Sequence, residues 1–169
     1  MKITNSTSAD IPKIFELYGI ATAYMQSKNQ VSWPEFSKEL VQTEIDENQQ
    51  WKLLLEGEIA CIWATTQTDA LIWGAKDLEP SLYLHRIATN PHFRGRNLVK
   101  QLIDWANAHG KAKGLSFLRM DTVGLNKGLI GHYKKMGFQF LGAKKLDDTT
   151  GLPAHYQEGE VCLFQKDIV

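Results

Sequence analysis

Residues Leu84–Val99 read LHRIATNPHFRGRNLV and join a predicted strand to a short basic loop and to the beginning of a predicted helix. The first amides of a helix have no partner within the helix and lie at the positive end of its dipole, so they can receive an anion. Gly95 lets the backbone approach a ligand closely, and Arg94 and Arg96 add positive charge. Asn97 is one of the few residues that tolerate a left-handed backbone. The stretch therefore predicts a phosphate-binding loop, with a basic loop that only caps the helix as the alternative.

Apolar patterns on either side of this stretch predict the other elements. Strands are predicted at residues 2–5, 51–55, 59–65, 81–89, 117–123, 138–143 and 161–165. Helices are predicted after Ser8, from near Ser32 to before Asn48, from Asn97 to Gly110 or Gly114, and at residues 126–136. Residues 70–76 are predicted as a loop or a strand extension, and residues 147–159 as a surface loop.

This order of elements predicts an α/β fold of the α+β kind. We expect one mixed, mostly antiparallel central sheet of about seven strands, flanked by about four helices. A chain of 169 residues with a 43% hydrophobic share can build one core, and no linker divides it. The prediction is a single domain over residues 1–169.

Composition excludes several classes of protein. Lys plus Arg and Asp plus Glu each number 19, so the net charge is zero, which disfavours nucleic-acid and anionic-membrane partners. The longest apolar run, Ile59–Ala64, is far shorter than the roughly 20 residues that span a bilayer, and Met1 is followed by polar residues. We therefore expect a cytoplasmic protein. Cys61 and Cys162 lie in predicted strands without metal-ligand spacing, which predicts buried free thiols and no metal.

Two motifs carry a resemblance to a known family. The first is Ile87-Ala88-Thr89 followed by the loop and helix beginning NPHFRGRNL, residues 90–98. The second is Met120-Asp121-Thr122, then Asn126, then HYKKMGF at residues 132–138. Together they resemble the GNAT superfamily of acetyl-CoA-dependent N-acetyltransferases, which implies a GNAT-type sheet. The resemblance also implies an enzyme that transfers an acetyl group from acetyl-CoA directly to a primary amine of a small molecule or peptide.

The resemblance further implies which residues bind acetyl-CoA. The end of the strand would pair with the pantetheine arm, and the loop amides would hold the pyrophosphate. Asn126 would hydrogen-bond the arm near its thioester end. The implied cofactor-binding residues, with Asn126, are Ile87, Ala88, Thr89, Arg94, Gly95, Arg96, Asn97, Leu98 and Val99.

Two residues are candidates for proton transfer. The resemblance places Tyr133 beside the thioester sulfur, where a phenol with a pKa of about 10 can donate a proton to the leaving thiolate. A core aromatic is the alternative for Tyr133. His85 titrates near neutrality and is the candidate base, with a structural histidine as its alternative. Strand alternation predicts that His85 and Arg86 face opposite sides of the sheet, and that Arg86 serves as an ion-pair partner.

Other assignments stay open at the level of sequence. The acceptor pocket is expected to use Tyr24, Trp33, Glu35, His155 and Tyr156. The donor could be a longer acyl-CoA, and the acceptor a protein amine. A homodimer could form through an exposed Trp73 or through the final strand. A CoA-binding regulatory module with little or no turnover is also an alternative, because Val99 stands where the family has a small residue.

Overall fold

The strands predicted at residues 51–55 and 59–65 form a hairpin in the computed structural model, which describes residues 1–169. Strand β2, Gln50–Leu55, pairs antiparallel with β3, Glu58–Thr66. Glu56 and Gly57 between them have positive φ angles of 54° and 85°. A two-residue hairpin turn of this kind needs positive φ at both positions, because its twist then matches that of the strands.

The hairpin is part of one seven-stranded sheet in the order β1-β2-β3-β4-β5-β7-β6. The remaining strands are β1 Lys2–Asn5, β4 Ser81–Thr89, β5 Phe117–Val123, β6 Gln139–Lys144 and β7 Val161–Asp167. Every neighbouring pair is antiparallel except β4 and β5, which are parallel. The predicted mixed, mostly antiparallel sheet is therefore confirmed.

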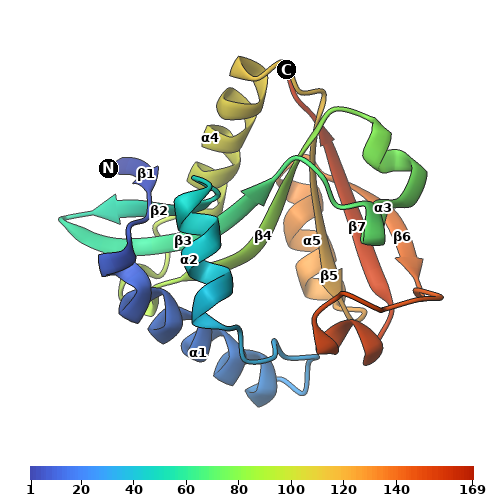
Figure 1. Cartoon of the computed structure of the whole chain (residues 1–169), viewed down its shortest axis with the longest axis horizontal. Coiled ribbons are helices and arrows are strands. Elements are labelled where there is room, and N and C mark those ends of the chain that lie inside the picture. Colours follow the sequence, from blue (N-terminus) through green and yellow to red (C-terminus); the bar gives the residue numbers. More distant parts are fainter.

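The parallel pair β4–β5 joins the two halves of the sheet over a short length. Its register contains only Ser81↔Phe117, Leu82↔Leu118 and Tyr83↔Arg119. Beyond these residues the two strands diverge, as Figure 1 shows. Residues 84–89 of β4 consequently pair with β3 on one side and with no strand on the other.

Helices cover both faces of the sheet (Figure 1). The four longer helices are α1 Ile11–Ser27, α2 Lys38–Asp46, α4 Leu98–Ala112 and α5 Lys127–Lys135. The short elements are η1 Ser8–Asp10, α3 Ala70–Trp73, η2 Gly74–Leu78, η3 Pro91–Phe93 and η4 Ala154–Gln157. Helices α4 and α5 pack on the largest core cluster, which includes Cys61 and Trp63, whereas α1 and α2 pack on a second cluster with Ile62. The alternation of residues 61–63 along β3 thus supplies both cores.

The prediction for the second helix was wrong at its beginning. Helix α2 begins at Lys38 rather than near Ser32, because the Ser37 hydroxyl caps it by accepting the Leu40 amide at 3.1 Å. Trp33 and Phe36 lie before the helix and pack edge-on against Tyr18, with ring centroids 5.7 and 5.4 Å away. These aromatic contacts fix the segment in an irregular conformation.

The prediction for residues 70–76 was also wrong, since they form α3 and most of η2. Trp73 at the end of α3 is 3% exposed and stacks 4.8 Å from the guanidinium of the fully buried Arg119. The dimer contact considered for an exposed Trp73 is therefore excluded. Cys61 and Cys162 are buried and unpaired, as predicted. None of the helices has the length and apolar character needed to cross a membrane.

Candidate active site

The loop after β4 has the shape predicted from its sequence. Gly95 and Asn97 have positive φ angles of 84° and 53°, and α4 begins at the next residue. The amides of Gly95 and Asn97 make no hydrogen bond within the chain, and neither do those of the first turn, residues 98–100. The side chain of Arg96 forms an exposed ion pair with Glu56, with 3.3 Å between Nη2 and Oε1. A row of open donors at a helix N-terminus is thus present beside two exposed arginines.

Val99 packs against the main core cluster beneath α4. It is partly buried, whereas its neighbours Asn97 and Lys100 are exposed. The branched side chain therefore contributes to helix packing, and the open amides of the loop remain accessible.

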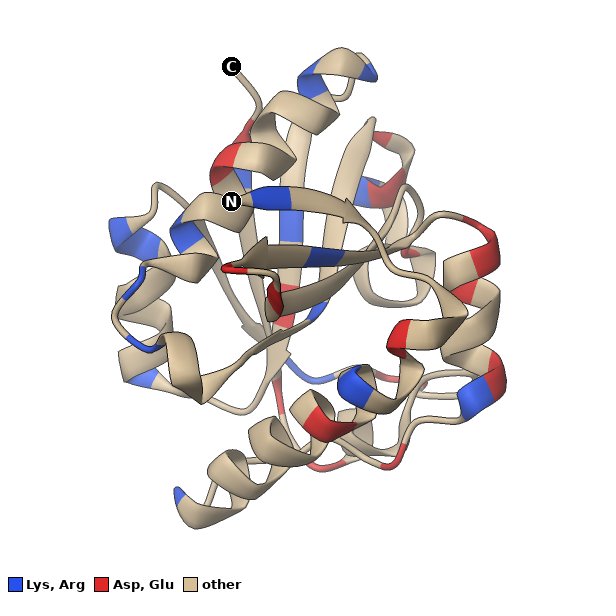
Figure 2. Cartoon of the chain, turned by 90° about the vertical axis from the view of Figure 1, so that its left-hand side faces the viewer, with Lys and Arg blue, Asp and Glu red and all other residues tan.

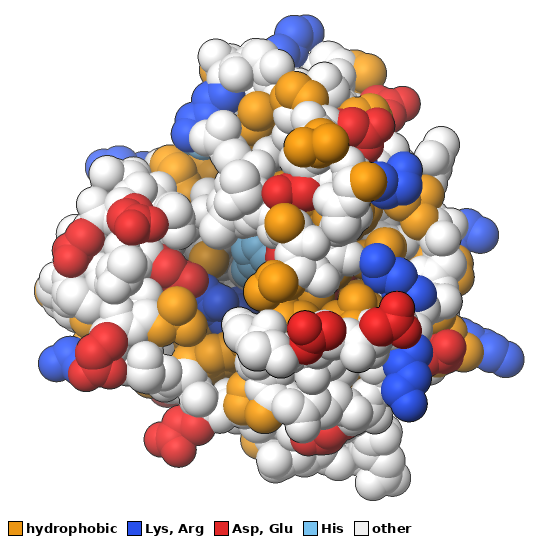
Figure 3. All heavy atoms as spheres, turned by 45° about the vertical axis from the view of Figure 1, so that its right-hand side comes forward, with side chains coloured by type: hydrophobic (Ala, Val, Ile, Leu, Met, Phe, Trp, Pro, Cys, Tyr) orange, Lys and Arg blue, Asp and Glu red, His pale blue; other side chains and the backbone are white.

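A cavity of about 880 Å³ lies where β4 and β5 diverge. Figure 3 shows a hollow on this side of the molecule, with a histidine at its floor and hydrophobic side chains along its rim. Among the predicted site residues, the cavity brings together His85, Ile87, Asn126 and Tyr133. The predicted residues of the phosphate loop lie outside it, further along the edge of β4.

The cavity is lined from both faces of the sheet. Tyr133 comes from α5, and Leu84 and Met120 belong to the core cluster on that face. Arg86 bonds to residues of α1 and α2 on the opposite face, and it lines the same cavity. The space therefore passes through the gap between the two strands.

Tyr133 is a buried aromatic residue whose hydroxyl reaches the cavity. Its ring packs against Phe138 and Phe164, with centroids 6.0 and 5.2 Å away, and the residue is 8% exposed. Its hydroxyl makes no hydrogen bond within the chain. Burial, with a smaller contribution from Cys61, raises the pKa of Tyr133 to about 12. The phenol therefore keeps its proton at neutral pH.

Asn126 also has a structural role. It is the N-cap of α5, and its Oδ1 atom accepts the amide of Leu129 at 3.0 Å. Its Nδ2 atom donates no hydrogen bond within the chain and remains available to a ligand in the cavity.

The prediction that His85 and Arg86 face opposite sides was wrong. Two residues of β4, Arg86 and Ile87, stand opposite the single residue Trp63 of β3, because the pairing moves from Ala64↔His85 to Ile62↔Ala88. Arg86 has a φ of 48° at this β-bulge. A bulge inserts one residue and so reverses the alternation, which brings both His85 and Arg86 into the cavity.

Arg86 forms the ion pair expected of it. Its Nη2 atom bonds to Glu44 of α2, and its Nε atom donates to the hydroxyl of Tyr18 at 3.2 Å. Its guanidinium lies 5.1 Å from the ring centre of Phe36. The single positive side chain of the cavity lining is thereby neutralised.

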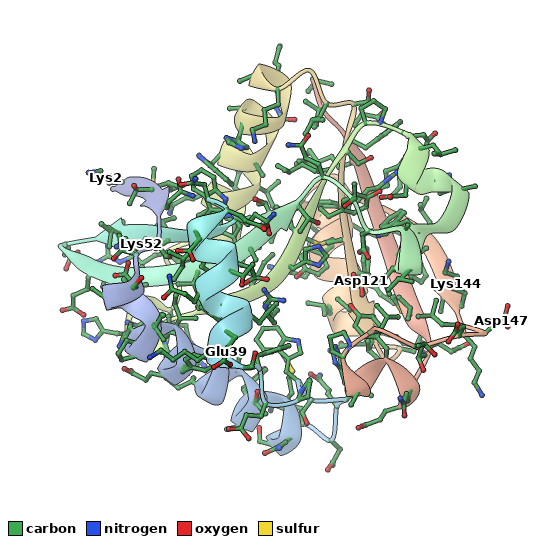
Figure 4. The ribbon with its side chains drawn as sticks, in the orientation of Figure 1. Lys2, Glu39, Lys52, Asp121, Lys144 and Asp147 are labelled. Atoms are coloured by element: carbon green, nitrogen blue, oxygen red, sulfur yellow. The ribbon has the colours of Figure 1, made fainter.

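Two carboxylates that no sequence motif points to lie beside His85. Potential ligand atoms of Asp69, His85 and Asp121 all lie within 4.8 Å of one another. Asp121 accepts the hydroxyl of Tyr156 at 2.7 Å, and His85 Nε2 lies 3.1 Å from the hydroxyl of Thr66. Figure 4 labels Asp121 between the α3 segment and the η4 segment. These residues come from distant parts of the chain, so no local pattern could have shown their proximity.

The surroundings shift the pKa of each group in this cluster. Burial and the neighbouring charges of Asp121 and Asp77 raise the pKa of Asp69 to about 7. Burial raises the pKa of Asp121 to about 6. Burial and Arg86 lower the pKa of His85 to about 3, so its imidazole is neutral at pH 7. The carboxyl groups, rather than the histidine, titrate near neutrality.

Three of the five residues expected at an acceptor pocket lie together in the structure. Trp33, His155 and Tyr156 line the cavity, whereas Tyr24 and Glu35 are exposed outside it. The predicted surface loop 147–159 therefore also forms a cavity wall, because η4 turns its ring side chains inward.

Basic and acidic residues are unevenly distributed over the molecule. In Figure 2 the left-hand edge carries mainly Lys and Arg, whereas the right-hand side carries more Asp and Glu together with some Lys and Arg. Residues 94–101, at the beginning of α4, hold three basic residues and no acidic one, whereas residues 35–47, around α2, hold five acidic residues and one lysine. The beginning of α4 is thus locally basic, and the surroundings of α2 are locally acidic.

The model of the acetyltransferase (GNAT) family matches residues 17–138, which include both motifs and most of the cavity lining. The chain belongs to this family. Its expected membership in a family of acyltransferase enzymes, with a GNAT-type sheet, is therefore confirmed. YesJ of Bacillus subtilis, an uncharacterized N-acetyltransferase, is 32% identical over 80 residues, which are 47% of this chain and 44% of YesJ.

Solved structures of this family share the fold. A GNAT-family acetyltransferase of Listeria monocytogenes has a TM-score of 0.75 at 23% identity, covering 98% of this chain and 94% of its own. The structure of yncA from Salmonella typhimurium, with its cofactor acetyl-CoA, has a TM-score of 0.70 at 12% identity. The match covers 100% of this chain and 94% of the yncA chain. The ribosomal-protein-S18-alanine N-acetyltransferase of Escherichia coli has a TM-score of 0.68 at 16% identity. The match covers 99% of this chain and 93% of the Escherichia coli chain.

Proposed function

We propose that this GNAT-family protein transfers the acetyl group of acetyl-CoA directly to a primary amine of a small molecule or peptide. One observation carries the proposal. The cavity between β4 and β5 is continuous with an unpaired strand edge that leads to open helix amides, and a protonated tyrosine reaches it from one face.

The residues along this edge fit acetyl-CoA. The backbone groups of Ile87 and Thr89, on either side of Ala88, would bond the pantetheine arm as an added strand does. The open amides of Gly95 and of residues 97–99, with the side chains of Arg94 and Arg96, would receive the phosphates. Asn126 would donate its free Nδ2 to the arm near the thioester.

The two faces of the gap separate the leaving group from the acceptor. The amine nitrogen forms its bond to the acetyl carbon as the carbon–sulfur bond breaks. Tyr133, on the α5 face, donates its proton to the sulfur. His85, on the other face, is a neutral hydrogen-bonding group that orients the amine. Neither cysteine is needed as a nucleophile, since burial raises the pKa of Cys61 to about 12 and that of Cys162 in the same direction.

Calorimetric titration of the protein with acetyl-CoA, beside CoA, ATP and NAD, tests this function. We expect micromolar binding of acetyl-CoA, stronger than that of ATP or NAD, followed by release of free thiol when a primary amine is added. No binding at millimolar acetyl-CoA would contradict the proposal. Binding without thiol release across a panel of small amines and peptides would favour the CoA-binding module, and release only with longer acyl-CoA would change the donor.

A further inference from the structure

The cavity contains polar groups that the chain itself leaves without a partner. Asp69 Oδ2, Glu44 Oε2 and His155 Nδ1 are buried and make no hydrogen bond. Glu44 and His155 are each 8% exposed, and all three residues line the cavity. Asp69 Oδ2 and Glu44 Oε2 can therefore each accept a hydrogen bond from a donor placed in the cavity.

The charge of the lining is negative. Glu44, Asp69 and Asp121 are its acidic residues, and Arg86 is its only lysine or arginine. Because Glu44 pairs with Arg86, the two aspartates have no cationic partner. Their ligand atoms lie within 4.8 Å of each other, close enough for one small cation to contact both.

We propose that Asp69 and Asp121 bind the ammonium group of the acceptor and remove its proton, and that the acceptor is a primary amine without a carboxylate. This inference rests on the proposed function and names its substrate class. An ammonium group has three donors, which suits the unpartnered Asp69 oxygen and its neighbour. A carboxylate on the acceptor would find no free cation, since Arg86 is already paired.

Proton transfer balances along this arrangement. The aspartate pair takes one proton from the ammonium, and the neutral amine then attacks the acetyl carbon. Tyr133 gives its proton to the departing sulfur, and the nitrogen loses its extra proton through solvent to restore Tyr133. The aspartate pair then releases its proton to solvent, which is the one net proton of the reaction. Carboxyl groups that titrate near neutrality are better matched to the first step than the neutral His85.

The groups facing the pair come from several elements. They are His85 of β4, Tyr156 of η4 and Asp77 of η2. A divalent metal ion is a less suitable occupant than an ammonium group. Asp121 already accepts the Tyr156 hydroxyl, and His85 Nε2 is engaged with Thr66.

The remainder of the acceptor would meet an apolar wall. Trp33, Phe36, Leu125 and Leu152 line the cavity. Such a wall favours an amine with an apolar body. Phenethylamine and phenylalanine are therefore a matched pair of probes, because they differ only in the carboxylate.

The experiment uses the full chain and the variants Asp69→Asn and Asp121→Asn, with Glu39→Gln on the exposed side of α2 as the control of equal charge change. Amine binding is measured by calorimetry with and without CoA, which cannot react. Turnover is measured by thiol release from pH 5.5 to 9. Thermal unfolding and acetyl-CoA affinity verify that each variant is folded.

We expect wild-type kcat/KM for phenethylamine to exceed that for phenylalanine at least tenfold. Asp69→Asn should weaken phenethylamine binding about tenfold. Asp121→Asn should lower kcat/KM about 100-fold and remove the ionisation near pH 6 to 7 from its profile. Glu39→Gln should stay within twofold of wild type.

Equal use of phenylalanine, or folded aspartate variants with wild-type binding, rate and pH profile, would overturn the inference. Loss of activity on chelation, restored by Zn²⁺ or Mn²⁺, would overturn it in favour of a metal site. If acetyl-CoA fails to bind while phenethylamine binds in an Asp69-dependent manner, the proposed function fails and the amine site stands.

Discussion

One backbone angle at Arg86 decides which side chains reach the cavity. Without the bulge, Arg86 would follow the alternation of β4 toward the α4 face, where Leu84 and Ile87 pack. Its φ of 48° turns it toward Tyr18 and Glu44 instead. A positive φ at arginine has no sequence signal, so strict alternation was the natural prediction and failed.

Tyr133→Phe tests the acid directly, because it removes the phenolic proton and keeps the ring that packs on Phe138 and Phe164. We expect kcat to fall by about 10² to 10⁴, with acetyl-CoA affinity unchanged within a few-fold. Stopped assays of thiol release and calorimetry measure the two quantities. Tyr24→Phe, which removes an exposed phenol on α1, is the matched control. An undiminished rate for Tyr133→Phe would refute the role.

At the scale of elements, structure that depends on neighbouring residues was predicted well, whereas contacts between distant residues were not. The loop and α4 follow from a single stretch of sequence, since Gly95, Asn97 and the apolar face of the helix are local signals. The beginning of α2 was missed because Ser32 with Pro34 resembles a cap, while Ser37 caps in fact. Asp69 and Asp121 meet only through the tertiary fold, so no local sequence pattern could predict the acidic part of the cavity.

Helix α2 is tied to the sheet by Glu44, whose pair with Arg86 leaves the two side chains only 10% and 14% exposed. Glu44→Gln removes the charge and leaves Arg86 buried without a counter-ion. We expect the free energy of unfolding in urea to fall by about 3 kcal/mol. Glu39→Gln, on the exposed face of the same helix, should change it by less than about 0.5 kcal/mol. Equal effects of the two substitutions would show that the pair contributes nothing specific.

Across the whole molecule, the aspartate pair should make stability depend on pH in an unusual direction. The pKa of Asp121 rises from 3.8 to about 6 on folding, so the folded chain binds this proton more tightly than the unfolded chain. The resulting stabilisation is complete below pH 4 and is lost as the pH rises through 6. A carboxyl group whose pKa is raised in this way lowers the free energy of unfolding at neutral pH, because it is ionised there in a buried position.

Asp121→Asn should remove the decrease in the free energy of unfolding that wild type shows as the pH rises through 6, because asparagine does not titrate. Relative to wild type, the free energy of unfolding of the variant should therefore increase between pH 4 and pH 7, on the order of 2 kcal/mol. Urea denaturation of both proteins across this range gives the difference. A difference that is constant with pH would contradict the raised pKa.

The three residue pairs between β4 and β5 also have a consequence for how the chain opens. They are the only ladder between the half of the sheet with β1–β4 and the half with β5, β7 and β6 (Figure 1). Such a boundary separates two cooperative units, and each unit can open without the other. Backbone amides near the boundary should therefore exchange with solvent faster than they would if only global unfolding exposed them. A molecule that binds along the unpaired edge of β4 would fasten the halves together and slow exchange in both. Binding of a ligand along the unpaired edge of β4 is thus coupled to the rigidity of strands that the ligand does not contact.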